Sequence, residues 1–507
     1  MSTDYSRGLR LAAAAAGADA VTLRESLSAT NVHLTADPDI PGVLPALSVV
    51  VADLRRLPYQ LTLDPTGGAA PIPDTVLTDL QILVSEIDPD RPLGVTAAPA
   101  QCLHVHLGAQ PPSGAAFSGV PDGHGVRLRH RGHALPSLNA PGSGLGAVLT
   151  AATVTAEVFK RTTGLRPGTY GTAPTLDFCP VTLGTEPGMM TDTLDEIRST
   201  ALVGAGAIGT GITLILGLMG TTGELTVVEP ESFEPPNVTT YSIGTRHDAD
   251  ERVHKTQLVR RYLPRMDVTP IPRSAQDFID AVDNGTASWP HTVLGAVHSV
   301  EARHEIQRIH ADLTLDGSTG GSAGTTLALH EAVPRGPCIR CYYPQPTVPV
   351  GPSAEQLLHE ATGLPLPRIA RGDEIITDAD LDGLSARHRA ALLPYVGKPV
   401  CGVSNLMGLT TTDADDFQPS ASFVAQQAAC LVVGAMIARR TGHVAGPMRH
   451  VEYDARVGPW YDMTTPRRPR ATCTCQTDAD LIARVRAYRR RELESPPNTP
   501  HGRAPVA

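Results

Sequence analysis

Aromatic residues are scarce in this sequence, and basic residues are outnumbered. Phe, Trp and Tyr make up 4% of the 507 residues, so we expect cores built from Ala, Val, Leu and Ile. No run of about 18 apolar residues stands out, which predicts that no helix spans a membrane. There are 42 Lys and Arg against 52 Asp and Glu. The resulting net charge of −10 argues against a nucleic-acid partner or an anionic membrane surface.

Cysteine is also too rare, at 8 residues, for a disulfide scaffold. The Ala-rich start, residues 11–18, faintly resembles a signal peptide, but it is weakly apolar and reaches Asp19 at once. We therefore expect a helix there and a cytoplasmic protein. The length exceeds that of one usual domain and predicts two or three.

Two pairs of cysteines point to a metal. Cys338 and Cys341 form a CxxC motif, and Cys473 and Cys475 form a CxC motif about 130 residues later. Four thiolates in two close pairs can complete a tetrahedral, structural zinc site, which would tie the end of the chain to its middle. The alternative is four buried cysteines without a metal.

The second half of the sequence has an alternating α/β pattern. Strands are predicted at residues 199–203, 224–229 and 292–297, and helices at residues 207–219, 252–263 and 300–311. This alternation predicts a doubly wound, Rossmann-like and mainly parallel sheet.

The first half is predicted to be a degenerate α/β domain. We expect strands at residues 47–52 and 103–107, and a helix at residues 146–163 that ends at Gly164. Residues 151–164 can be aligned with residues 429–442, because both are small-residue helices that end in basic residues, Thr and Gly. Either two Ala-rich helices have converged, or two halves are related and only the second keeps a nucleotide loop. The predicted division is 1–191 for the degenerate domain, 192–485 for the nucleotide-binding domain, and 486–507 for a charged helix end and a disordered tail.

The clearest local motif is a GxGxxG between a predicted strand and a predicted helix. Gly204 allows the tight turn, Gly206 lets the backbone approach a phosphate, and Gly209 permits close packing of helix on sheet. Glu229 ends the next strand, where a carboxylate can accept both ribose hydroxyls. The motif favours an adenine nucleotide and leaves ATP and NAD both open.

The residues after this strand carry a family resemblance. The chain resembles the ThiF-type, ubiquitin-activating-enzyme-like adenylyltransferases over about residues 193–475. That family's order of motifs is matched by Gly204, Gly206, Gly209, Glu229, Glu231, Asn237, Lys255, Cys338, Cys341, Cys473 and Cys475. The resemblance changes the preferred nucleotide from NAD to ATP.

The resemblance implies a reaction and roles for individual residues. Family members use ATP and Mg²⁺ to adenylate the C-terminal carboxylate of a ubiquitin-like or sulfur-carrier protein, and they release pyrophosphate. By position, Gly204 and Gly206 would lie along the phosphates and Glu229 would hold the ribose. Asn237 and Lys255 would contact phosphate oxygens.

Two departures from the family pattern bear on catalysis. Thr240 stands where the family has an arginine, and His298 stands where it has the aspartate that holds the metal. A neutral imidazole is a poor substitute for a carboxylate as a ligand of Mg²⁺. His298 stays among the candidate residues of the nucleotide site. Either this site carries out adenylation with a different set of residues, or the domain binds its ligands without turnover.

Three hypotheses follow from these patterns. The first is an enzyme that adenylates a protein or peptide carboxylate, with Cys401 then forming a thioester; the alternative for Cys401 is an incidental loop cysteine. The second is a catalytically degenerate, ThiF-like module that recruits a peptide or a partner enzyme. The third is an NAD-dependent oxidoreductase, which rests on the GxGxxG and Glu229 alone. We expect either a homodimer or a pseudo-dimer formed by the two halves of one chain.

Overall fold

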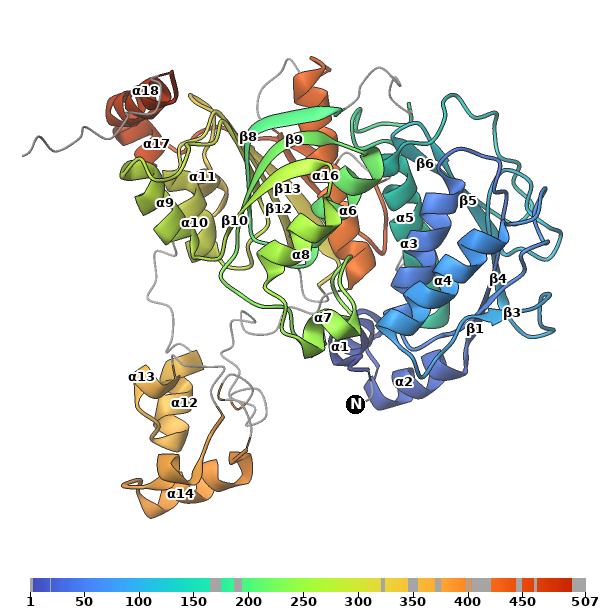
Figure 1. Cartoon of the computed structure of the whole chain (residues 1–507), viewed down its shortest axis with the longest axis horizontal. Coiled ribbons are helices and arrows are strands. Elements are labelled where there is room, and N and C mark those ends of the chain that lie inside the picture. The colour runs from blue at the N-terminus through green and yellow to red at the C-terminus, as the bar shows by residue number, and fades with distance from the viewer. Residues whose placement is uncertain are drawn as a thin grey trace, which may run out of the picture. The chain divides into compact units, whose positions relative to one another are not determined.

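The computed structural model of the chain is shown in Figure 1. The residues that it describes are 3–18, 20–164, 175–186, 194–320, 324–344, 354–369, 375–397, 400, 403, 421–443, 449–459 and 463–494. The chain forms two compact units, one from Met1–Tyr343 with Pro419–Ala507 and one from Pro344–Gln418. The predicted boundary at residues 191–192 and the predicted tail at residues 495–507 lie outside the described residues.

The first half of the larger unit contains a seven-stranded sheet. Its strands are β1 (Asn31–Ala36), β2 (Gln60–Leu63), β3 (Gly94–Val95), β4 (Leu103–Leu107), β5 (Phe117–Asp122), β6 (Gly125–His130) and β7 (Thr175–Phe178). They lie in the order β3-β2-β1-β4-β5-β6-β7. The pairs from β3 to β5 are parallel, and β6 and β7 are added antiparallel. The helices of this half are α1 (Ser6–Ala16), α2 (Ala20–Ala29), α3 (Val43–Arg55), α4 (Asp74–Ile87) and α5 (Gly144–Thr162).

The second half contains an eight-stranded sheet. Its strands are β8 (Glu196–Val203), β9 (Thr222–Val228), β10 (Met266–Ile271), β11 (Thr292–Gly295), β12 (Leu313–Gly320), β13 (Thr326–Ala332), β14 (Arg449–Asp454) and β15 (Thr464–Pro466). They lie in the order β10-β9-β8-β11-β12-β13-β14-β15. The main helices are α6 (Ala207–Met219), α8 (Lys255–Tyr262), α9 (Ala275–Asp283), α10 (Val300–Arg308) and α16 (Ser422–Arg440). The strands and helices predicted for this half are confirmed, with ends shifted by a few residues.

The two sheets repeat one topology. In each, a first strand lies between the second and the fourth strands of its half, and a parallel fifth strand is followed by two antiparallel ones. The aligned segments 151–164 and 429–442 lie in and just after α5 and α16, each following the sixth strand of its half. Each helix is followed by a glycine at positive φ, +72° at Gly164 and +78° at Gly442. The shared topology favours two related halves over the convergence of two helices.

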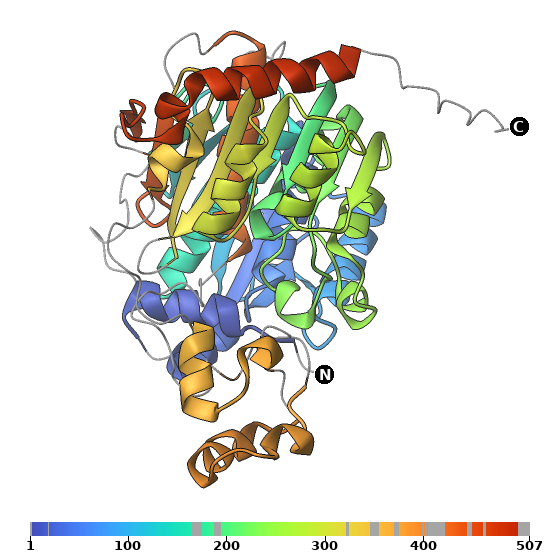
Figure 2. The ribbon, with the colours of Figure 1, turned by 90° about the vertical axis from the view of Figure 1, so that its left-hand side faces the viewer.

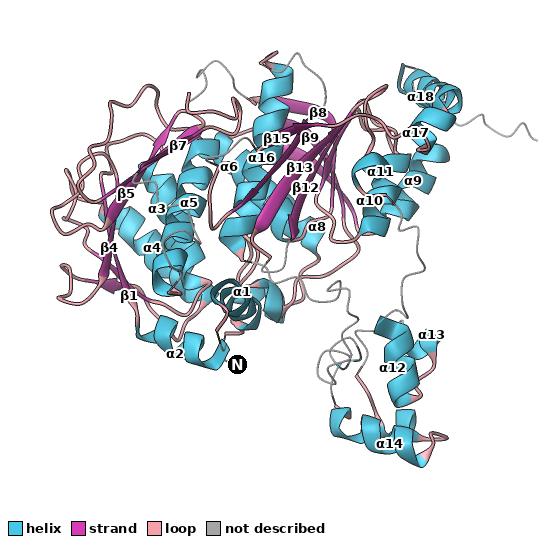
Figure 3. Cartoon of the chain, turned by 180° about the vertical axis from the view of Figure 1, so that it is seen from behind, coloured by secondary structure: helices cyan, strands magenta, loops and turns pink. Residues whose placement is uncertain are grey.

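The halves pack through helices that lie between the two sheets (Figure 3). α3 packs on α5, α6 packs on α16, and α5 contacts both α6 and α16. Small residues and aromatic rings fill this layer, and the rings of Phe159 and Phe423 lie 5.3 Å apart between their centres. A buried hydrogen bond also crosses it, from the Gln426 amide to the Asp53 carboxylate at 2.9 Å.

Helix α16 qualifies the prediction about membrane spans. Within the part of the chain that the structure describes, it is the single helix long and apolar enough to cross a membrane by length and composition. However, 94% of its most apolar 18-residue window is buried inside the protein. The apolar side chains of α16 therefore pack in the core between the halves.

The strand predicted at residues 47–52 is wrong, because this segment lies in α3. The helix is buried on nearly every side, where it packs on the first sheet, α4 and α5. A helix that is apolar all round has no 3.6-residue periodicity, and three successive valines favour a strand by propensity. Tertiary packing overrides that propensity. The strand predicted at residues 103–107 is confirmed as β4, and the predicted helix at residues 146–163 as α5.

A buried polar network lies on one face of the first sheet. The Thr35 hydroxyl lies 3.0 Å from His104 Nε2 and 2.9 Å from His106 Nδ1, and His106 Nε2 lies 3.2 Å from the Asp37 carboxylate. His33 packs edge-on against His104, with ring centres 5.0 Å apart. Burial lowers the pKa of His104 to about 4, and it also lowers that of His33. Both imidazoles are therefore neutral in the folded protein near neutral pH.

This network predicts a loss of stability in acid. Between about pH 6.5 and 4 the unfolded His104 binds a proton that the folded protein rejects, so the free energy of unfolding falls as the pH is lowered. The shift corresponds to on the order of 2–3 kcal/mol. Urea unfolding at pH 7.5 and at pH 4.5 measures it, and His104→Gln should reduce the difference. An equal difference in the variant and the wild type would contradict the assignment.

The smaller unit is helical and has its own core. Its described α-helices are α12 (Ala354–Thr362), α13 (Leu366–Ile369) and α14 (Ala386–Leu392), and it has two short 3₁₀ helices, η2 (Asp378–Leu381) and η3 (Leu393–Tyr395). Leu358, Ile376 and Leu392 belong to an apolar cluster formed within the unit. The sequence prediction did not separate this unit from the nucleotide-binding domain.

The predicted C-terminal helix is confirmed as α18 (Ala479–Glu494), which lies across the ends of α9 and α10 (Figure 2). Arg489 donates to the Ile309 carbonyl at 2.7 Å and pairs with Asp283, and Arg490 pairs with Asp312. The helix runs through the predicted division at residue 485.

Candidate functional site

The Gly-rich loop connects β8 to α6, as the sequence predicts. Gly204 has φ +95°, and a Cβ there would lie 2.5 Å from the Ala296 carbonyl oxygen. A Cβ on Gly209 would lie 2.2 Å from the Gly204 oxygen. Gly206 caps α6 and has no side chain to occupy the N–H groups of the first turn. The start of α6 is therefore shaped to receive an anion.

A single methyl group should disrupt this loop. Gly204→Ala forces an L residue into a left-handed backbone and against the carbonyl of Ala296, at a cost of several kcal/mol. We expect a lower melting temperature and loss of nucleotide binding, measured by thermal unfolding and titration calorimetry. Gly320→Ala is the matched control, because nothing lies within 4 Å of its Cβ position. Wild-type nucleotide affinity in Gly204→Ala would contradict the assignment of the loop.

Glu229 lies one residue after β9 and holds the loop. One carboxylate oxygen accepts the Ala205 N–H at 2.8 Å, and the other accepts the Glu231 N–H at 3.0 Å. The residue is only 7% exposed. A carboxylate has about four acceptor positions, so two remain for hydroxyl groups of a ligand.

Lys255 is buried at the start of α8 and is held by Glu231. Its Nζ lies 2.5 Å from the Glu231 carboxylate and 5.2 Å from the centre of the Tyr241 ring. The lysine side chain is 3% exposed, whereas that of Glu231 is 62% exposed. Burial alone would lower the pKa of Lys255, but Tyr241, Glu229 and Glu231 raise it above its ordinary value. The ammonium is therefore charged, and its partner is open to exchange with a ligand.

The predicted cysteine pairs come together. Cys338 Sγ lies 3.9 Å from Cys341 Sγ and 3.5 Å from Cys473 Sγ, and Cys341 Sγ lies 3.5 Å from Cys475 Sγ. Tetrahedral zinc with bonds of about 2.3 Å requires sulfur atoms about 3.8 Å apart. Among the described residues this is the one group that could hold a metal ion. Burial, and then the neighbouring cysteines, raise the pKa of Cys338, a cost that a bound cation removes.

Comparison with protein families matches residues 187–475 of the chain to the ThiF family. This span covers more than half of the chain. The chain belongs to the ThiF family. The ThiF family belongs to the E1-like adenylyltransferase superfamily. No curated protein matches the chain in a sequence search.

The ThiF match covers the half of the chain that carries the Gly-rich loop. In the first half, the segment after β1 carries Asp37 where the second half has its loop. The Asp37 carboxylate accepts backbone N–H groups of Ala69, Ala109 and Gln110 at 2.8, 2.9 and 3.1 Å. These donors are thereby satisfied by an anion of the chain itself.

The two departures from the ThiF pattern have different environments. Thr240 is fully buried, and its hydroxyl lies 3.4 Å from the Asn237 carbonyl, so it does not reach out of its segment. Asn237 itself closes the short helix η1 (Pro235–Asn237), where its side-chain oxygen accepts the Glu234 N–H at 2.8 Å. His298, by contrast, is exposed three residues after β11.

Arg7 is a cation that acts on Glu231 and that the sequence interpretation missed. The start of α1 is fixed to the second half by a hydrogen bond of 2.7 Å from the Thr239 hydroxyl to the Asp4 carbonyl. Burial acts to raise the pKa of Glu231, but Lys255, His298 and Arg7 together lower it. Arg7 thus adds positive charge near Glu231 from the other half. No sequence motif links it to that site.

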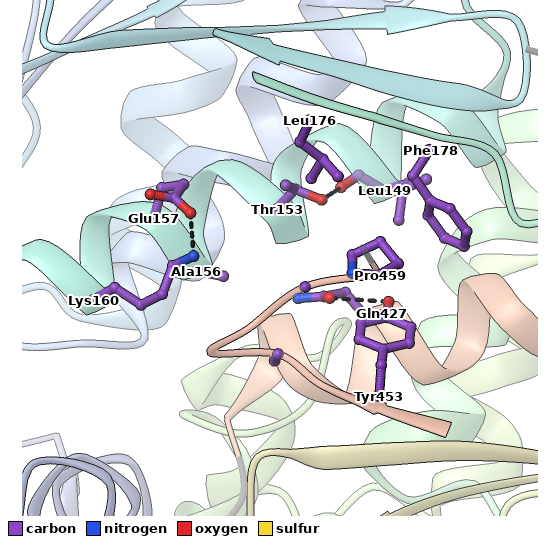
Figure 4. Close-up of a pocket in the computed structure, with 12 residues that line it drawn as sticks. Leu149, Thr153, Ala156, Glu157, Lys160, Leu176, Phe178, Gln427, Tyr453 and Pro459 are labelled. Atoms are coloured by element: carbon purple, nitrogen blue, oxygen red, sulfur yellow. Dashed lines mark hydrogen bonds and ion pairs between the residues drawn. The ribbon is translucent and has the colours of Figure 1, made fainter. Parts of the chain in front are cut away.

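A small cleft opens elsewhere between the halves (Figure 4). It is lined from α5, β7, α16 and β14. Lys160 points at Glu157, and the Tyr453 hydroxyl donates to the Gln427 side-chain oxygen at 3.1 Å. None of its lining residues belongs to the Gly-rich loop. Cys401, the predicted nucleophile, lies outside the described residues.

Proposed function

We propose that the protein uses ATP to adenylate the C-terminal carboxylate of a ubiquitin-like protein, a sulfur-carrier protein or a peptide. The observation that carries this proposal is the charged, buried Lys255 at the mouth of a Gly-rich loop in a ThiF-family sheet. An ammonium at that position can neutralise charge on a phosphate that leaves.

The proposed reaction is a single displacement at phosphorus. An oxygen of the substrate carboxylate attacks the α-phosphorus of ATP, the bond to the bridging oxygen breaks, and pyrophosphate leaves. Lys255 and Arg7 bind the developing negative charge, and the first turn of α6 donates N–H groups to the phosphates. Glu229 accepts the ribose hydroxyls, and Asn237 contacts a phosphate through its amide.

Magnesium does not fit the position that His298 occupies. Mg²⁺ prefers hard oxygen ligands in octahedral geometry, and an exposed imidazole offers none. The neutralisation of phosphate charge is therefore assigned to the cations of the chain. Zinc, in contrast, fits the four cysteines, and its proposed role is structural.

Cys401 is proposed to act after adenylation. Its thiolate attacks the carbonyl carbon of the acyl-adenylate, the bond to AMP breaks, and a thioester forms. A carrier protein covalently attached to the chain through a bond that thiols cleave supports this step, provided that the attachment is lost in Cys401→Ala. Attachment that survives the substitution contradicts it.

The second candidate is a binding module without turnover. The replacement of the family's arginine by the buried Thr240 and of its aspartate by His298 favours it. An NAD-dependent oxidoreductase stays the weakest alternative, because it rests only on the loop and Glu229.

ATP–pyrophosphate exchange distinguishes these candidates. The full chain is tested with carrier proteins encoded by adjacent genes and with peptides that end in Gly-Gly. Exchange that depends on one carboxylate substrate supports the enzyme. Carrier binding without exchange supports the binding module, and hydride transfer with NAD supports the oxidoreductase.

A further inference from the structure

The segment around Thr240 presents a second polar group, Tyr241, to the Gly-rich loop. A Cβ on Gly206 would lie 3.7 Å from the Tyr241 hydroxyl oxygen. Gly206 is the glycine at which the backbone approaches a phosphate. The hydroxyl therefore stands at the place where the loop opens toward its anion.

Packing fixes the orientation of this ring. Tyr241 is 6% exposed, and the Phe233 ring packs edge-on against it, with centres 5.5 Å apart. The Tyr241 N–H donates to the Asn237 carbonyl at 2.9 Å. The ammonium of Lys255 lies on the face of the ring, 5.2 Å from its centre. Because these contacts already hold the ring, its side chain loses little conformational entropy when the hydroxyl binds a ligand.

The charge state suits a donor. Burial raises the pKa of Tyr241, although Lys255 lowers it, so the hydroxyl keeps its proton at neutral pH. A phenol in this state has one O–H to donate, and it accepts as well.

We propose that the Tyr241 hydroxyl donates a hydrogen bond to the phosphate chain of the bound nucleotide, beside Lys255, and so supplies a donor where Thr240 supplies none. This inference rests on the proposed function, because it assumes a nucleotide phosphate at the loop. In this chain a neutral hydroxyl donor would then contact the phosphates where other family members use an arginine.

Tyr241→Phe tests the role, because it removes one oxygen atom and keeps the ring against Phe233. Hydrogen bonds to charged groups are worth enough that we expect ATP to bind roughly 10- to 100-fold more weakly. Adenosine, which has no phosphate, should bind with unchanged affinity. Tyr59→Phe is the matched control, since its buried hydroxyl lies 2.6 Å from Thr162 in the first half. It should leave both affinities unchanged.

Titration calorimetry of the full-length variants with ATP, AMP and adenosine separates the outcomes. An equal loss for adenosine and ATP would assign a merely structural role to the hydroxyl, and unchanged or tighter ATP binding would show that it makes no favourable contact. Either result overturns the inference. If ATP binds the wild type and requires Lys255, such a failure leaves the proposed function intact. If the wild type binds no ATP, both fail together.

Discussion

Lys255→Ala should lower ATP–pyrophosphate exchange by at least about 100-fold, the loss typical of removing a group that stabilises developing charge. The ammonium is 3% exposed and is held between Glu231 and the ring of Tyr241 at the start of α8. Glu231 is 62% exposed and can be solvated when its partner is removed, so the fold should survive. Exchange and ATP affinity are measured on the same preparation, with the melting temperature as a check on folding.

Arg198→Ala is the matched control for the loss of a cation. Arg198 pairs with Glu196, and its side chain is 75% exposed, so its removal should change exchange little. If Lys255→Ala retains wild-type exchange, the assignment of Lys255 to the phosphates is wrong.

Cys338→Ser should release zinc from the protein. The wild type is expected to hold about one zinc ion per chain, and the variant far less, because a tetrahedral site that loses one thiolate of four binds weakly. Loss of several kcal/mol of metal binding lowers the melting temperature by on the order of 10 °C. The segment before Cys473 should also become sensitive to trypsin, because Arg467 and Arg470 offer cleavable bonds next to the site.

Cys102→Ser provides the control for this prediction. Cys102 is half-buried and lies outside the cluster, so its loss should leave the zinc content at the wild-type value. A zinc content in Cys338→Ser equal to that of the wild type would contradict the four-cysteine site.

The second half of the fold follows from local patterns in the sequence. The loop Gly204–Gly209 begins a helix directly after a strand, and both are amphipathic or buried in the expected way. The paired cysteines are short motifs whose spacing already matches a zinc site. Such features depend on neighbours in the sequence, so they can be read without a structure.

The first half depends more on tertiary contacts. β1 contains His33 and Thr35, polar residues that become acceptable in a core only because β4 brings His104 and His106 beside them. No strand was predicted there, although these polar residues alternate with Val32 and Leu34 as in a strand. For the opposite reason α3, which is apolar on all sides, was predicted as a strand.

Contacts between the halves are the least predictable features of the site. Arg7 lies in the first helix of the chain, far from the Gly-rich loop in the sequence. The hydrogen bond between Thr239 and Asp4 fixes the start of that helix to the second half. Tyr241 follows Thr240, the position at which the family has an arginine. Its hydroxyl is recognised as part of the site only from its distance to Gly206. Pairing two related halves in one chain is what brings such residues together.

The central claim is that one Gly-rich loop binds an adenine nucleotide. The number of nucleotide molecules bound per chain tests this claim most directly. Calorimetric titration of the full chain with ATP and, separately, with NAD gives this number. One ATP per chain, with no comparable binding of NAD, is predicted, because the Gly-rich loop follows β8, whereas Asp37 follows β1 at the corresponding position of the first half. Preferential binding of NAD, two ATP sites per chain, or no nucleotide binding at all would contradict it.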